Sequence, residues 1–241
     1  MIKSNKNVLK HISDWLISYK KSSQAKCFVV YFDSTRHSTL LIHLCFLAAV
    51  PVYIVTTNDS KASENNNNYK FLISLFGDKI NPIHVFYDSL DAPKNPSYTH
   101  SIADLYSGII LGSIDKTFGL YLRKYKKHQE YTSDIFPLYD LFYSDIVKIS
   151  SELFANVDFN DSADENKVRL IEWSIMNNIR TSIITNAELP EKSKHWYMYN
   201  YNQKVIISEM YQRDKLTMHK KIQKPYCSIY SNPLLVLDVF G

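Results

Sequence analysis

The chain has 241 residues, 45% of them hydrophobic, and a net charge of +4. This length and hydrophobic content suit one domain with a core large enough to fold without disulfides or metals. No run of about 18 apolar residues occurs, so we expect neither a membrane span nor a signal peptide. Its cysteines, Cys27, Cys45 and Cys227, are scattered without CxxC spacing, which argues against disulfides and zinc and predicts reduced thiols in a cytoplasmic protein.

Charge and glycine content bear on the ligand. The mild positive charge, spread along the chain, favours an anionic partner weakly, and a nucleotide would suffice. The chain has only 5 glycines, where average usage of about 7% gives roughly 17. Because glycine builds the loops that cradle phosphate, few such loops are expected.

Hydrophobic patterns predict alternating helices and strands. The expected elements are a helix at 7–20, a strand at 27–32, a helix at 40–49, a strand at 52–56, a helix at 69–76, a strand at 83–87, a helical stretch at 102–105, a strand at 109–111, helices at 139–154, 165–176 and 203–218, and a further strand at 183–184. Polar stretches at 58–68 and 88–98 are expected to be loops. The order predicts a doubly wound parallel sheet of about five strands with helices on both faces, in a single domain spanning 1–241.

The turn after the first strand is the first candidate site. In a parallel sheet, ligands lie beyond the carboxyl ends of the strands, where a helix N-terminus can hold phosphate. Here that turn runs from Asp33 to Ser38. A polar turn before a helix is also ordinary capping chemistry, with Ser38 as the expected cap, so both interpretations stay open.

In position this turn resembles the SGGxDS loop of the ATP pyrophosphatases, which adenylate a substrate and release pyrophosphate. Asp33 stands for the first Ser, Ser34 and Thr35 for the two Gly, His37 for the Asp, and Ser38 is unchanged. A backbone cradle for pyrophosphate needs left-handed residues, a conformation that Ser and Thr resist by about 1–2 kcal/mol each. The altered loop therefore predicts a poor cradle.

Four later segments are similar to the ammonia-dependent NAD synthetases, in the family's order. Residues 111–118 resemble its GTxNKSE segment, 123–125 its TKYGD segment, 134–141 its DI-x-P-x-x-DL segment, and 215–225 its closing HKR-x-x-P element. The resemblance spans nearly the whole chain and implies a Rossmann-like, adenine-nucleotide α-hydrolase-like fold. It also implies a homodimer that amidates nicotinate adenine dinucleotide through an ATP-derived adenylate, with ATP and Mg²⁺ as cofactors if the chain is active.

The resemblance also implies two sets of binding residues. Those expected to bind the nucleotide are Ser34, Thr35, Arg36, Ser38, Ser113, Lys116 and Thr117. Those expected to bind the dinucleotide substrate are Lys124, Tyr125, Asp134, His219 and Lys220. No catalytic residue and no metal ligand is assigned.

Departures from the family pattern fall on the groups that hold Mg²⁺ and phosphate. Phe118 replaces the metal-binding Glu, Lys126 and Lys127 stand where Gly-Asp is expected, and Tyr143 replaces a Lys. Magnesium prefers carboxylate oxygens, and phosphoryl transfer depends on preorganised charge. The sequence therefore predicts an NAD synthetase-like protein with impaired or absent catalysis, although direct contact of phosphate with Arg36 or the lysines could preserve binding.

Three features bear on the expected partners. The altered site would also suit a non-catalytic structural or regulatory subunit of a larger assembly that keeps the fold. The aromatic cluster at 196–201 favours a protein interface over base stacking. The basic run at 123–128 is expected to be a solvated loop and not a nucleic-acid patch, because the overall charge is mild.

Overall fold

The computed structural model describes residues 5–57, 67–77, 85–88, 96–122, 133–161, 163–176 and 199–217. The helices in this part of the chain are α1 (Asn5–Ser23), α2 (Arg36–Leu47), α3 (Asn67–Phe76), α4 (Pro96–Tyr106), α5 (Lys116–Leu122), α6 (Tyr143–Leu153), α7 (Glu165–Met176) and α9 (Tyr201–Thr217). The strands are β1 (Cys27–Phe32), β2 (Val52–Thr57), β3 (Val85–Asp88) and β4 (Gly108–Leu111).

The strands form one parallel sheet in the order β3-β2-β1-β4. Phe28 pairs with Val52 of β2 on one side and with Ile109 of β4 on the other. The chain builds outward from β1 to β3 and then returns to the opposite side of β1, so the strand order reverses between β1 and β4. This is the predicted doubly wound sheet, and the strand expected at 183–184 lies outside the described residues.

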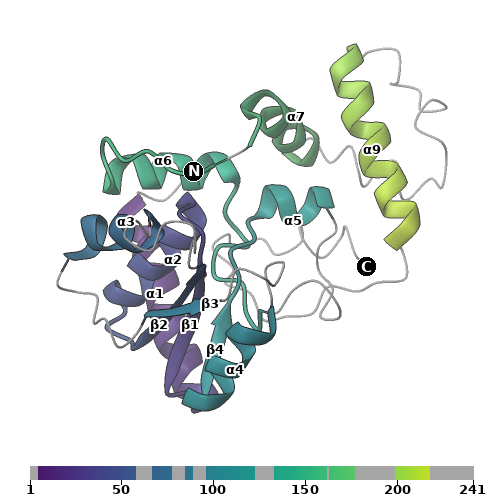
Figure 1. Ribbon diagram of the computed structural model, residues 1–241. Coiled ribbons are helices and arrows are strands. Elements are labelled where there is room, and N and C mark those ends of the chain that lie inside the picture. Colours follow the sequence, from purple (N-terminus) through teal and green to yellow (C-terminus); the bar gives the residue numbers. More distant parts are fainter. Residues whose placement is uncertain are drawn as a thin grey trace.

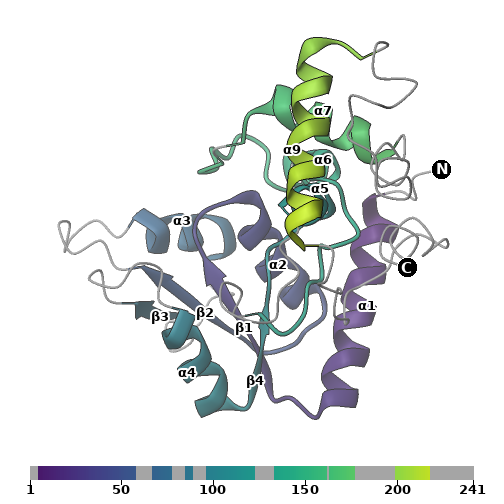
Figure 2. The ribbon, with the colours of Figure 1, turned by 90° about the vertical axis from the view of Figure 1, so that its right-hand side faces the viewer.

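Helices cover both faces of the sheet (Figures 1 and 2). On one face, alternate residues of β1 such as Phe28 and Val30 join a large apolar core with α1, α2, α3 and α6. On the other face, Val29 of β1 and Ile110 of β4 pack against α4. Because both faces are buried, β1 is a nearly continuous apolar run, which is why its bounds could be predicted from the sequence.

The buried thiols agree with the prediction from the sequence. Cys27 and Cys45 are buried and free, while Cys227 lies outside the described residues. Burial raises the pKa of Cys27 to about 11, so this thiol stays protonated at neutral pH.

Several element boundaries differ from the predictions. Helix α2 begins at Arg36 and not at residue 40, because its polar first turn hides the start from a search for apolar periodicity. Helix α6 begins at Tyr143 and not at residue 139, because the Leu141 carbonyl accepts a hydrogen bond from Lys116 N at 2.8 Å instead of a helical partner. The prediction of a loop over the whole of 88–98 was also wrong, because β3 ends at Asp88 and α4 begins at Pro96.

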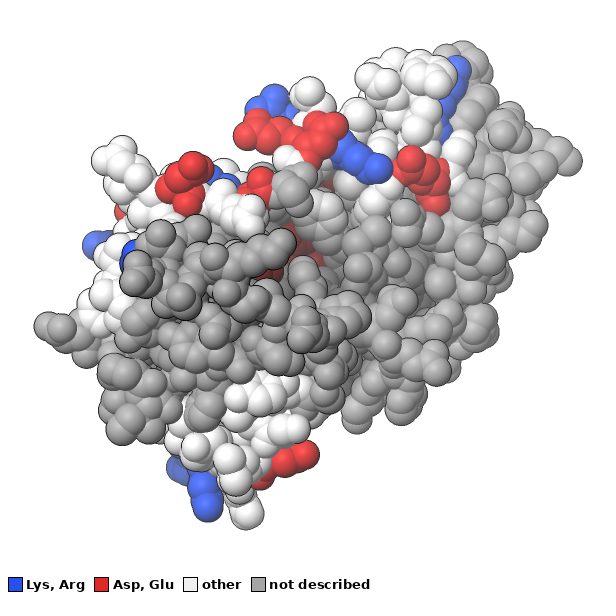
Figure 3. All heavy atoms as spheres, in the orientation of Figure 1, with Lys and Arg blue, Asp and Glu red and all other residues white. Residues whose placement is uncertain are grey.

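Within the described ranges, no helix combines the length and the apolar character needed to cross a bilayer. On the face drawn in Figure 3, blue and red side chains of the described residues alternate along the upper edge and form no extended basic patch. The basic run at 123–128 lies outside these ranges, so its assignment as a solvated loop stays a prediction.

Candidate functional site

The turn after β1 folds around the carboxylate of Asp33. Its Oδ1 accepts hydrogen bonds from Thr35 N at 3.2 Å, from Thr35 Oγ1 at 2.7 Å and from Ser38 Oγ at 2.7 Å. Thr35 is extended and caps α2, because its side-chain oxygen accepts from Ser38 N. The prediction of Ser38 as the cap was therefore wrong, and Ser38 lies buried in the first turn of the helix.

Ser34 adopts the left-handed conformation that its side chain disfavours. Its φ is +61°, and its carbonyl accepts a hydrogen bond from Asn160 N at 3.0 Å. A Ser side chain resists this conformation, and the surrounding loop imposes it on Ser34. The expected cradle is thus half-formed, with Ser34 left-handed and Thr35 extended.

We expect Ser34→Gly to be about 1 kcal/mol more stable than Ser34→Ala. Both variants lack the hydroxyl, so the difference isolates the cost of a Cβ in the left-handed region at φ +61°. Chemical denaturation of both variants would measure it. An alanine variant that is equally stable or more stable would contradict the left-handed geometry of this loop.

Arg36, the first residue of α2, is paired with an acid from a distant part of the sequence. Its guanidinium forms an ion pair with Asp161, and its backbone N–H donates to Asp161 Oδ1 at 3.2 Å. The guanidinium also lies 4.9 Å from the ring centroid of Phe159. The segment before α7 is therefore fastened to the N-terminus of α2.

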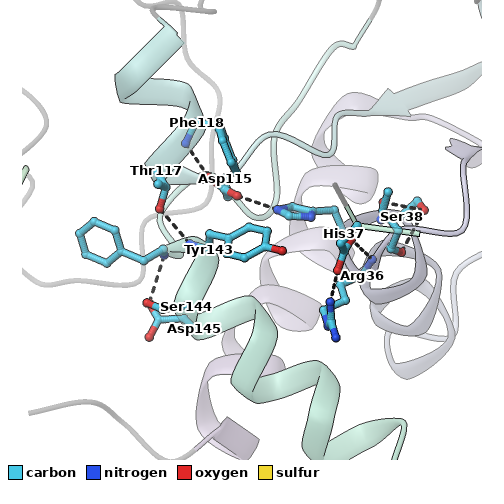
Figure 4. A network of polar contacts seen from close by, with 12 residues as sticks. Arg36, His37, Ser38, Asp115, Thr117, Phe118, Tyr143, Ser144 and Asp145 are labelled. Carbon is cyan, nitrogen blue, oxygen red and sulfur yellow. Dashed lines mark hydrogen bonds and ion pairs between the residues drawn. The ribbon is translucent and has the colours of Figure 1, made fainter. Parts of the chain in front are cut away.

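The loop after β4 meets the turn after β1, since the two strands are neighbours. His37 Nε2 lies 2.6 Å from Asp115 Oδ2, and the Asp115 side chain is fully buried. The other Asp115 oxygen accepts from Phe118 N at 2.8 Å and so caps the start of α5. Figure 4 shows the ring of Tyr143 directed toward His37, with ring centroids 5.6 Å apart.

Two predicted nucleotide contacts, Lys116 and Thr117, are buried and take part in internal contacts. Lys116 Nζ lies 3.4 Å from Asp140 Oδ1, with both side chains almost fully buried. The Thr117 hydroxyl donates to Glu172 at 2.9 Å and accepts from Tyr143 N at 2.9 Å. These contacts tie α5 to α6 and α7 behind the site.

The other predicted residues lie elsewhere. Ser113 is exposed on the loop after β4. Asp134 accepts a hydrogen bond from Ile110 N at 3.0 Å and so tethers its segment to β4. The predicted contacts outside the described residues are Lys124, Tyr125, His219 and Lys220. Tyr199, in the aromatic cluster, packs edge-on against Trp173, and the homodimer expectation stays a prediction.

A pocket of about 510 Å³ opens beside the turn. Aromatic rings form much of its wall, together with two residues of the turn and the start of α7. Its lining residues are Thr35, His37, Phe118, Tyr121, Tyr143, Asn160, Asp161, Ala163, Asp164, Lys167 and Val168. Burial raises the pKa of Tyr143, and the nearby carboxylate of Asp161 raises it further. The Tyr143 hydroxyl therefore stays protonated at neutral pH.

The pocket offers little to a Mg²⁺ ion. Phe118 faces it where the NAD synthetase resemblance implies a metal-binding Glu. Asp115 and Asp161 each use both carboxylate oxygens on protein donors. No group of three His, Cys, Asp or Glu side chains is placed to hold a metal among the described residues. The described residues of the pocket do not fit a protein-held Mg²⁺.

Some residues of the site could not be found from the sequence. Asp161, Tyr121 and Lys167 belong to no motif, and only the fold brings them to the turn. Asp115 was within a recognised segment, but its pairing with His37 had no sequence signal.

No protein-family profile matches the chain, and no curated protein matches it by sequence. Solved structures match nearly the whole chain. NMN synthetase from Francisella tularensis has a TM-score of 0.62 at 13% identity, over 93% of this chain and 99% of its own. The NH3-dependent NAD synthetase from Campylobacter jejuni subsp. jejuni NCTC 11168, in complex with the nitrate ion, has a TM-score of 0.60 at 14% identity, over 92% and 99%.

The glutamine-dependent NAD+ synthetase from Acinetobacter baumannii, in complex with ADP, has a TM-score of 0.52 at 8% identity, over 93% of this chain and 47% of its own. At these identities the likeness shows the fold, and the chain has the fold of the NAD and NMN synthetases. The expected fold class is confirmed.

Proposed function

We propose that this chain binds an adenine nucleotide in the pocket beside β1 and β4, and that it has lost most or all of the adenylating activity of an NAD synthetase. The observation that carries the proposal is the composition of the pocket. Phe118, Tyr121 and Tyr143 supply aromatic surface, and the basic side chains of the neighbouring turn, Arg36 and His37, already contact carboxylates.

The position and size of the pocket support nucleotide binding. It lies where the strand order reverses, which is where open α/β sheets bind their ligands. Its volume of about 510 Å³ is within the usual range for small-molecule sites. Aromatic rings give a base a stacking surface, and the protonated hydroxyl of Tyr143 can donate a hydrogen bond. The pocket therefore suits the nucleoside part of a nucleotide.

The electrostatics of the same pocket argue against adenylation. Attack on an α-phosphate needs preorganised positive charge on the phosphoryl group. Here Arg36 is neutralised by Asp161 and Lys116 lies beside Asp140. Phe118 offers no oxygen to a metal that would bridge phosphates. Stabilisation of the transition state is thus weakened more than recognition of the base.

The proposal predicts that the nucleoside supplies most of the affinity. In calorimetric titrations, adenosine and ATP should bind with affinities within about tenfold of each other. Phe118→Ala should weaken adenosine binding by roughly tenfold or more, because stacking on one aromatic ring contributes about 1–3 kcal/mol. Tyr201→Ala is the matched control, since this aromatic side chain is 79% exposed and does not line the pocket.

Two outcomes would contradict the proposal. One is the absence of heat from either ligand with folded wild-type protein. The other is an adenosine affinity that Phe118→Ala leaves unchanged, which would place any binding elsewhere on the chain.

A further inference from the structure

Asp161 lies where an anion would be expected to bind. Its Oδ1 accepts from the backbone N–H of Arg36, the first residue of α2, and its other oxygen pairs with the Arg36 guanidinium. A helix N-terminus carries partial positive charge and attracts anions, phosphate among them. The carboxylate thus engages both the helix donor and the cation that a phosphate group would use.

The segment that carries Asp161 is anchored at several points. Asn160 N donates to Ser34 O at 3.0 Å, and the Phe159 ring lies under Arg36 and packs edge-on against Phe71 with centroids 5.9 Å apart. The Asp161 side chain is only 10% exposed. These contacts hold the carboxylate in place without any ligand.

The Arg36 guanidinium has a donor that Asp161 does not engage. Its Nε is buried and has no hydrogen-bond acceptor among the described residues. A carboxylate on NH1 leaves this donor unsatisfied, whereas a phosphate group has enough oxygens for a bidentate contact. A phosphate group therefore has the oxygens to satisfy this donor, but only once Asp161 has moved away.

We propose that Asp161 is a specificity-determining residue, an internal anion that occupies the phosphate position and makes the pocket discriminate against ligands with a pyrophosphate or triphosphate group. The inference deepens the proposed function and rests on it for the identity of the ligand as a nucleotide. A polyphosphate binds only after it displaces this carboxylate from Arg36 and from the helix N-terminus.

Asp164 provides a matched control in the same pocket. It also lines the cavity, but its Oδ1 accepts from Asn166 N and Lys167 N and so caps α7. Asparagine caps helices about as well as aspartate. Asp161→Asn and Asp164→Asn therefore remove the same charge from the same pocket, and only the first removes the charge that is paired with Arg36.

The test uses inorganic pyrophosphate, which has no nucleoside part, in calorimetric titrations at one fixed ionic strength. Asp161→Asn should bind it at least tenfold more tightly than the wild type, and Asp164→Asn should stay within about twofold. The double variant Arg36→Gln/Asp161→Asn should lose the gain. Thermal denaturation checks that each variant is folded, and Asp161→Ser replaces the asparagine variant if that protein does not fold.

Equal affinities of the wild type and Asp161→Asn would overturn the inference. So would equal gains in Asp161→Asn and Asp164→Asn, which would indicate a general charge effect, or a gain that survives the loss of Arg36. Adenosine titrations separate this result from the proposed function. If adenosine fails to bind while pyrophosphate gains affinity in Asp161→Asn, the nucleotide proposal fails and the role of Asp161 stands.

Discussion

Replacing Lys116 by alanine is expected to lower the free energy of unfolding by about 3–5 kcal/mol. Lys116 Nζ lies 3.4 Å from Asp140 Oδ1, with side chains 6% and 3% exposed. It also lies 5.2 Å from the ring centroid of Phe142. Removal of the ammonium takes away the cation that lies beside this buried carboxylate, and breaking a buried ion pair by removing one partner is strongly destabilising. Urea denaturation of the wild type and the variant measures the loss.

A double substitution separates charge from packing. Lys116→Met keeps most of the aliphatic stem, so it should be destabilised almost as much as the alanine variant. Lys116→Met/Asp140→Asn removes both charges and should recover much of the stability, as replacing both members of a buried ion pair often does. Wild-type stability in Lys116→Met alone would contradict the account of this pair.

Replacing Gly112 by alanine is expected to lower the free energy of unfolding by about 1–3 kcal/mol. A Cβ at this position would lie 2.4 Å from two atoms of the Phe136 ring and 2.9 Å from Ser133 Cβ. Gly112 N also donates to Ile135 O at 2.8 Å, so the two segments cannot simply separate. The glycine is required by this close approach. Thermal and urea denaturation measure the loss.

The same substitution in a Phe136→Ala background tests the cause. With the ring removed, Gly112→Ala should cost clearly less than it does in the wild type, and the difference gives the coupling between the two positions. An equal cost in both backgrounds would show that the ring clash is not the reason.

A central strand of the sheet, β1, could be predicted because it is buried on both faces. Every residue of β1 is apolar, and its bounds at Cys27 and Phe32 agree with the sequence pattern. The bounds of α7 agree with the predicted 165–176, but the starts of other helices could not be predicted as well. Helix α2 opens with polar residues, and α5 was not predicted as a helix, because seven residues are too few for a periodic pattern.

The candidate site was located in part. The sequence identified the turn at Ser34, Thr35 and Arg36 because it follows a buried strand and precedes a helix. It gave no sign of Asp161, which lies 125 residues from Arg36 along the chain. Ion pairs between distant segments depend on the fold, and the neutralisation of Arg36 by such a pair is what changes the expected chemistry of the site.

The central claim is that the pocket keeps nucleotide recognition without adenylation. The most direct measurement is NAD formation by the purified protein with nicotinate adenine dinucleotide, ATP, Mg²⁺ and ammonium, beside an active NAD synthetase as positive control. We predict no NAD above the protein-free control at high protein concentration, with adenosine binding intact. ATP-dependent turnover that falls in the Phe118→Ala variant would contradict the claim and show that this site still carries out the reaction.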